Sequence, residues 1–167
     1  MARGDARRPT VKQRELALRL LESQSAMALS TVSVDGSPRV APLFYLPDED
    51  LHLYWFSSSA SEHTRNLQRD PAAAVAVYRP TDDWKQICGV QMRGSAAVVA
   101  DPARREAIGS AYMARFRLGA IFGAVMRRSR LYEFQPAWLR YFDNSRRFGY
   151  KFELLLEHKC ETKWGGL

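Results

Sequence analysis

The stretch YWFSSSASEHTRNL, at residues 54–67, changes abruptly from apolar to polar, and the fold prediction starts from it. Four serines fall within five residues, and Ser61 is suited to cap the helical pattern that follows. The free N–H groups and the dipole of a helix N-terminus attract negative charge. Arg65, one turn further on, adds a fixed positive charge. The stretch predicts an anion site suited to a phosphate, with an ordinary polar loop before a capped helix as the alternative.

Length and composition indicate one folded domain. The chain has 167 residues, of which 46% are hydrophobic and 26% charged, which is enough for a buried core. We therefore take residues 1–167 as a single domain with a flexible N-terminus (1–9) and a flexible tail (157–167). No apolar run reaches the ~20 residues that span a membrane, and the polar N-terminus lacks the apolar centre of a signal peptide. We expect a cytoplasmic protein without a membrane partner.

Charge and cysteine usage argue against several classes of function. The net charge of +7 raises nucleic acid as a partner, but the basic residues are dispersed and no helix carries a continuous basic face. The two cysteines, Cys88 and Cys160, make no disulfide framework. His158 and Cys160 have no accompanying ligand pair, so we predict no metal site. No catalytic triad or carboxylate pair is recognisable, and catalytic residues stay unassigned.

The rest of the chain alternates strand and turn signals, with helices towards both ends. Asp35-Gly36 predicts a hairpin turn, and Gly89 and Gly94 predict bends of the kind that close a sheet into a barrel. We expect the first three strands to form an antiparallel meander. The predicted strands are 26–34, 38–46, 51–56, 72–78, 87–99, 131–134, 139–142 and 150–156, and the predicted helices are 10–24, a short helix after Ser61, 101–116 and 118–126. The fold class is mainly β (α+β): a six- to eight-stranded antiparallel split β-barrel with flanking helices.

A family resemblance rests on the order of several segments. They are ALSTV at 28–32, DGSPRVAP at 35–42, WFS at 55–57, SEHTRNL at 61–67, Pro71 with VAV at 75–77, and VQMRG at 90–94. In this order they resemble the pyridoxamine 5'-phosphate oxidase-like family of FMN-binding split barrels, over roughly residues 13–117. The ending at 138–151 resembles a bacterial branch of that superfamily rather than the oxidase itself.

The resemblance implies an FMN held at a homodimer interface. Arg39 and Val40 match the segment that meets the flavin ring and phosphate. Ser57 matches a hydroxyl near the ring or the ribityl chain, and Ser58 and Ser61 fall in the phosphate loop. This agrees with the separate prediction of an anion site in residues 57–61.

The sequence departs from the family pattern at three places. His63 stands where many members carry Lys or Arg; a neutral imidazole still donates one hydrogen bond, and a phosphate would favour its protonated form. Phe44 replaces a Lys of the oxidase. The C-terminal Arg motif that grips pyridoxamine phosphate is not recognisable, so we do not expect pyridoxamine phosphate as the substrate.

Three further residues have alternative interpretations. Arg65 serves the anion site or pairs with Glu62, its i, i+3 neighbour. Gln91 shares a strand face with Arg93, and this face meets either the flavin groove or the core, because a one-residue slip exchanges the faces. Asn144 belongs to a turn or reaches the flavin edge from its own or the partner subunit.

The predicted function is that of an FMN-binding flavoprotein, an oxidoreductase acting on a small molecule. The cofactor would supply the redox reactivity and the protein would supply position and electrostatics. Three alternatives stay open: a flavin carrier or sensor without turnover, a relative that binds haem or deazaflavin F420 on the same fold, and a basic nucleic-acid-binding barrel.

Overall fold

The computed structural model describes residues 10–156, apart from the side chains of residues 120–122. The predictions for residues 1–9 and 157–167, including those for His158 and Cys160, lie outside the described residues. Within the described part, no helix has the length and apolar character needed to cross a membrane.

Eight strands and four α-helices make up the described chain. The strands are β1 (Ala26–Val32), β2 (Pro38–Phe44), β3 (Leu46–Pro47), β4 (Leu53–Ser57), β5 (Ala72–Tyr78), β6 (Cys88–Val98), β7 (Arg130–Asp143) and β8 (Lys151–Leu155). The helices are α1 (Val11–Ser23), α2 (Glu62–Arg69), α3 (Pro102–Phe116) and α4 (Ala120–Arg128), with a short 3₁₀ turn, η1, at Trp84–Gln86. Thr10 and Asp101 cap α1 and α3 through their side chains, as their sequence positions indicate.

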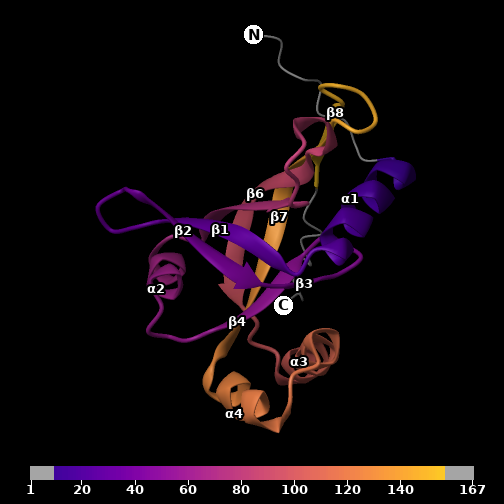
Figure 1. Cartoon of the computed structure of the whole chain (residues 1–167). Coiled ribbons are helices and arrows are strands. Elements are labelled where there is room, and N and C mark those ends of the chain that lie inside the picture. The colour runs from indigo at the N-terminus through magenta and orange to yellow at the C-terminus, as the bar shows by residue number, and fades with distance from the viewer. Residues whose placement is uncertain (1–9, 157–167) are drawn as a thin grey trace, which may run out of the picture.

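One antiparallel sheet contains all the strands. Its order is β2-β1-β5-β6-β7-β4-β3, with β8 added to β7. β2 and β3 stand at opposite ends of this order, yet only Tyr45 separates them in the chain, so the chain itself joins the two ends of the curled sheet. Figure 1 shows α2 and α1 on opposite sides of the strands, and α3 with α4 together at one end. The predicted mainly β split barrel with flanking helices is confirmed.

The first hairpin forms as predicted. β1 and β2 pair antiparallel with Ser30 opposite Val40, and Gly36 in the turn between them has a φ of 79°. That positive φ suits glycine. β2, which carries Pro38 and Pro42, pairs only with β1 and so lies at an edge, where proline costs no ladder hydrogen bond.

The predicted meander is wrong in its last pairing. β4 pairs along its whole length with β7, and only the two-residue β3 of the preceding segment pairs with it. The chain reverses tightly between β3 and β4: Asp48 Oδ1 accepts the backbone N–H groups of Asp50 and His52, each at 2.9 Å, and Leu51 has a φ of 66°. The bend at Tyr45 followed by this turn carries β4 away from β2 to the other end of the sheet.

The two short strands predicted around Pro136 are instead the single strand β7. Arg93 pairs with Trp138 and Gly94 with Pro136, so Ala137 is the extra residue of a β-bulge. The bulge lets β7 continue past Pro136, which has no backbone N–H to donate to the sheet. Gly94 is required beside it, because a Cβ there would lie 2.0 Å from the carbonyl oxygen of Gln135.

The barrel interior is filled by aromatic and aliphatic side chains. Trp55 is fully buried, and its ring stacks on Tyr132 with centroids 5.5 Å apart. Tyr45, also buried, donates its hydroxyl proton to the carbonyl of Leu21 at 2.6 Å. This contact ties α1 to the bend that joins the two ends of the sheet.

Candidate functional site

The serine loop, residues 57–61, brings together several predicted site residues. Ser57 ends β4 and is only 7% exposed. Its Oγ lies 3.2 Å from Ser61 Oγ and 2.6 Å from His63 Nε2, on the first turn of α2. Ser58 closes the loop by accepting the Ser61 N–H at its carbonyl, at 3.1 Å. Two hydroxyls and an imidazole therefore converge where a strand enters a helix.

Ser61 occupies the N-cap position of α2, but its hydroxyl makes no cap hydrogen bond. It accepts from Ser57 instead. The first-turn N–H groups of α2 consequently have no side-chain partner from the cap, and such groups are suited to bind an anion.

Two arginines lie around the serine loop. Arg39, on β2, donates from Nε to Glu62 Oε1 at 2.9 Å, which ties β2 to the first turn of α2. Arg65 donates to the carbonyl of Ala60 within the loop. The possible pair between Arg65 and Glu62 is not formed, because Glu62 is paired with Arg39. Arg65 is the guanidinium that holds the loop backbone.

His63 is half-buried, and this burial lowers its pKa, although the nearby Glu62 carboxylate acts in the opposite direction. The imidazole is therefore neutral at pH 7 and shares one hydrogen bond with Ser57. An anion bound in the loop would favour the imidazolium and so gain a second charged donor.

An open groove of about 420 Å³ lies on the outer face of the sheet, and we call it the outer groove. Its lining residues come from five strands: Ala28, Ser30, Val40, Ala74, Val75, Ala76, Gln91, Met92, Arg93 and Trp138. Gln91 and Arg93 are exposed while Met92 between them is buried, so the register turns both polar side chains outwards. Val40 follows Arg39 directly, so adjacent residues on opposite faces of β2 contribute to the outer groove and to the contact with Glu62 at the start of α2.

Asn144 lies apart from these features. Its Nδ2 donates to the carbonyl of Trp84 at 3.1 Å, and its Oδ1 accepts the N–H of Gly149 at 3.1 Å. The amide thus holds the turn after β7 and does not line the outer groove. A role at the flavin edge, including one from a partner subunit, stays a prediction.

Aromatic residues near the end of β7 have separate roles. Trp138 lines the outer groove, and the guanidinium carbons of Arg93 and Arg140 lie 4.4 and 5.2 Å from the centre of its ring. Tyr141 is buried, stacks on Phe152 and donates its hydroxyl proton to Asp143 at 3.1 Å. Only Trp138 is therefore placed to meet a ligand.

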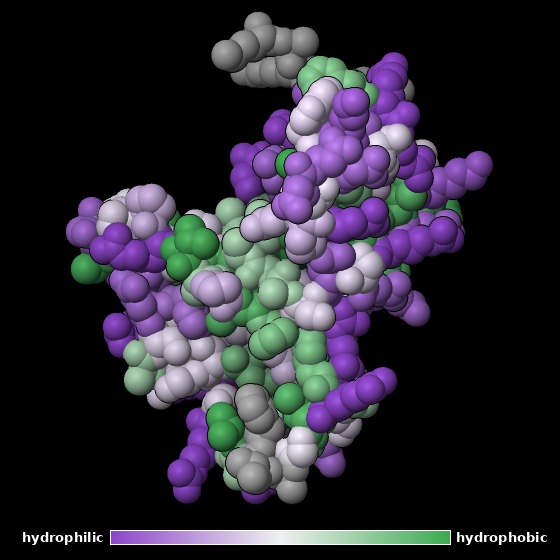
Figure 2. All heavy atoms as spheres, in the orientation of Figure 1, coloured by the Kyte–Doolittle hydropathy of each residue, from purple (hydrophilic) through white to green (hydrophobic). Residues whose placement is uncertain are grey.

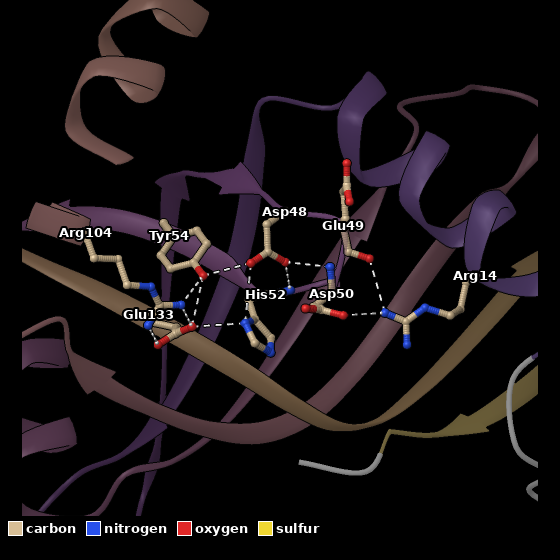
Figure 3. Close-up of polar contacts among 8 residues, drawn as sticks. All are labelled: Arg14, Asp48, Glu49, Asp50, His52, Tyr54, Arg104 and Glu133. Carbon is tan, nitrogen blue, oxygen red and sulfur yellow. Dashed lines mark hydrogen bonds and ion pairs between the residues drawn. The ribbon is translucent and has the colours of Figure 1, made fainter. Parts of the chain in front are cut away.

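A polar network that sequence reasoning missed joins α3 to the sheet (Figure 3). Glu133 on β7 accepts both terminal nitrogens of Arg104, at 2.6 and 3.1 Å, and the Tyr54 hydroxyl at 2.9 Å. His52 Nδ1 lies 3.0 Å from the same carboxylate, and the Tyr54 hydroxyl shares its single proton between Glu133 and Asp48, whose Oδ2 lies 2.8 Å away. These residues come from three separate parts of the sequence, 48–54, 104 and 133, so no local pattern connects them.

The network shifts the pKa values of its members, and those of His52 and Glu133 decide its charge state. The close approach of the imidazole to the carboxylates of Asp48 and Glu133 raises the pKa of His52 to about 9, against the effect of burial. Burial acts to raise the pKa of Glu133, but hydrogen bonds from His52, Arg104 and Tyr54 prevail and lower it to about 2. Both groups are charged at neutral pH, and each is paired within the network. Its role is to hold α3 and the β3–β4 turn against the barrel.

A further hollow of about 720 Å³ lies between α3 and α4, with Phe56 on its wall. It shares no lining residue with the outer groove. Arg105 crosses it and donates to the carbonyls of Met126 and Ser129, at 2.9 and 2.7 Å. None of the predicted site residues lines this hollow.

Comparison with known proteins agrees with this geometry. A family model described as pyridoxamine 5'-phosphate oxidase matches residues 14–143, which is most of the chain. No curated protein matches the chain by sequence.

Solved structures share the fold. A conserved hypothetical protein of Mycobacterium tuberculosis is similar with a TM-score of 0.70 at 18% identity, over 87% of this chain and 91% of its own. A heme binding protein from Mycobacterium smegmatis has a TM-score of 0.67 at 20% identity, over 90% of this chain and 60% of its own. HutZ, a heme storage protein from Vibrio cholerae, has a TM-score of 0.58 at 17% identity, over 73% of this chain and 89% of its own. At these identities the similarity establishes the fold alone.

Proposed function

The chain belongs to the pyridoxamine 5'-phosphate oxidase family, and from this premise we propose that it binds FMN and acts as a flavin-dependent oxidoreductase on a small molecule. The observation that carries the proposal is the convergence of Ser57, Ser61 and His63 at the start of α2, where Glu62 pairs with Arg39 on β2, the strand that also contributes Val40 to an apolar groove. A phosphate site beside a groove for a flat ring suits a flavin mononucleotide.

The residues present fit this cofactor. The serine loop, the first-turn N–H groups of α2 and Arg65 would hold the phosphate. Val40 and Gln91 would border the ring, and the groove has a volume in the range usual for small-ligand sites. FMN, when bound, supplies two-electron redox chemistry. The chain's own residues then orient it, and His63 gains a proton as the phosphate binds.

Phe44 contributes packing in place of a phosphate contact. Its ring lies 5.2 Å from that of Phe116, on α3. The phosphate therefore depends more heavily on the serine loop than in a relative with a lysine at this position. Mutations in the loop should accordingly have a large effect on FMN affinity.

The proposed assembly is a homodimer with the flavin at the interface. The outer groove is open to solvent and Val40 is 68% exposed at its edge. Figure 2 shows mainly apolar residues across the middle of the face in view, bordered by hydrophilic ones. A second copy covering the outer groove would bury Val40 and enclose a bound ring. On the sequence grounds given above, we also propose a cytoplasmic location.

The deciding experiment measures FMN binding to the full chain. An absorption spectrum of the purified protein, repeated after adding FMN and desalting, should show retained flavin bands. Riboflavin, which lacks the phosphate, should bind roughly 10- to 100-fold more weakly, because charged hydrogen bonds are lost. The S57A/S61A double variant should lose this preference, and S110A on α3 should keep it. Failure to bind FMN, or equal binding of both flavins, would refute the proposal.

Haem is the second candidate, because two of the similar structures are a heme binding protein and a heme storage protein. The described lining of the outer groove includes no His, Cys or Tyr side chain, so an axial ligand of these types would have to come from elsewhere. Titration with hemin and FMN in competition separates the two, and F420 can be added to the same series. A carrier or sensor would bind FMN but show no steady-state oxidation of NADH.

A further inference from the structure

One wall of the outer groove carries the exposed, positively charged side chain of Arg93. Arg93 and Trp138 lie opposite each other on β6 and β7. The Arg93 guanidinium carbon lies 4.4 Å from the centre of the Trp138 ring. Arg93 is exposed, lines the groove and forms no ion pair with any residue in the range 10–156.

The neighbouring charges are arranged so that Arg93 stays available. Glu153 on β8 accepts two hydrogen bonds from Arg140, at 2.7 and 2.9 Å, and one from the Trp138 indole N–H at 3.2 Å. This carboxylate is therefore occupied by Arg140, and it fixes the orientation of the indole. The fixed indole in turn orients the Arg93 guanidinium by a cation–π contact.

A guanidinium held in this way binds carboxylates and phosphates well. Its planar fork matches both anions, and the stacking reduces the entropy lost when a ligand binds. The rest of the groove is lined mainly by small apolar residues. The complementary ligand is a flat apolar body with one acidic group.

The phosphate of FMN is not the anion that this geometry favours. The serine loop follows β4, whose last residue Ser57 pairs with Arg130 on β7, whereas Arg93 pairs with Trp138, eight residues further along β7. At ~3.3 Å per strand residue that separation is roughly 25 Å along the sheet. Two anion-binding features this far apart imply two acidic groups.

We propose that Arg93, positioned by Trp138, forms a subsite for the carboxylate or phosphate of the substrate that enters the outer groove beside the flavin. This inference rests on the proposed function, because it takes the flavin to be the other molecule bound in the outer groove. It narrows the substrate class to aromatic or otherwise flat organic acids and their phosphorylated counterparts.

The test compares 2-naphthoate with its neutral amide, 2-naphthamide. Binding is measured by calorimetry on the full chain without flavin, and by perturbation of the flavin absorbance after loading with FMN. The wild type should prefer the carboxylate by roughly 10- to 100-fold, as expected for a charge-assisted hydrogen-bond pair. R93Q should remove the preference and R93K should keep part of it. R19Q removes an exposed charge on α1, far from the groove in sequence and on another element, and should behave as wild type.

The outcomes separate the subsite from the cofactor. Equal binding of naphthoate and naphthamide to the wild type, or an unchanged preference in R93Q, overturns the subsite. If R93Q instead abolishes the preference for FMN over riboflavin, Arg93 holds the cofactor phosphate and the proposal is wrong. If the chain prefers naphthoate through Arg93 but never binds FMN, the subsite stands and the proposed flavin function fails.

Discussion

Replacing Glu133 by glutamine tests the polar network that holds α3 to the barrel. The carboxylate is bonded to Arg104, Tyr54 and His52, and its side chain is only 9% exposed. Its pKa falls from the ordinary 4.5 to about 2. At ~1.4 kcal/mol per pKa unit, this shift corresponds to roughly 3 kcal/mol of folding stability. Removing one partner of a buried ion pair costs a similar amount, about 3–5 kcal/mol.

The assay is thermal unfolding of the full chain followed by circular dichroism. For a chain of this length, each kcal/mol shifts Tm by about 2–4 °C, so E133Q should lower Tm by roughly 6–12 °C at pH 6. The matched control is E15Q, which removes an exposed carboxylate 4.0 Å from Arg19 on α1. That pair contributes at most ~0.5 kcal/mol, or about 2 °C. FMN binding should survive in both variants, since Glu133 does not line the outer groove.

The folding stability should depend on pH in opposite directions for Glu133 and His52. The folded pKa of Glu133 is lowered, so its stabilisation is complete above pH 4.5 and is lost as the pH falls through about 2. The folded pKa of His52 is raised, so its stabilisation is complete below pH 6.5 and is lost as the pH rises through about 9. The Tm difference between wild type and E133Q should therefore be largest between about pH 4.5 and 6.5 and shrink towards pH 2. A difference that is below 2 °C at pH 6, or that does not vary with pH, refutes the reasoning.

Three further variants probe the bulge, the bend and the proposed interface. G94A should lower the free energy of unfolding by at least ~3 kcal/mol or fail to accumulate as folded protein, because the new Cβ would clash with the backbone of Gln135. An unchanged Tm would contradict the bulge geometry. Y45F leaves the Leu21 carbonyl without its donor at 2.6 Å, and it should lower the free energy of unfolding in urea by about 1–3 kcal/mol. An unchanged free energy of unfolding would contradict this hydrogen bond. A76E places a carboxylate in the outer groove and should give a monomer by light scattering, whereas an unchanged dimer would exclude this face as the interface.

Local sequence signals determined much of the fold. The Asp35-Gly36 turn, the capped starts of α1 and α3 and the strand at 72–78 all appear where short-range patterns place them. In each case the signal and the structure involve residues a few positions apart. The order of family segments adds the split-barrel class, which the sheet confirms.

The serine loop illustrates the limit of local reasoning within the candidate site. Its position before α2 follows from the sequence, and the contact between Ser57 and His63 spans only six residues, but the pair between Arg39 and Glu62 depends on the placement of β2 beside α2. The outward direction of Gln91 depends on strand register, which a one-residue slip would reverse.

Only the tertiary structure decided the long-range arrangements. Sequence alternation shows that residues 53–57 form a strand, but β7 as their partner lies more than seventy residues away in the chain. The bulge at Ala137 needs Gly94 opposite it, and the network at Glu133 needs α3 packed on β7. Pairing, register and buried charge contacts are properties of residues brought together by folding, so no window of sequence contains them. The pairing of Arg93 with Trp138, on which the proposed acid subsite depends, is of this kind.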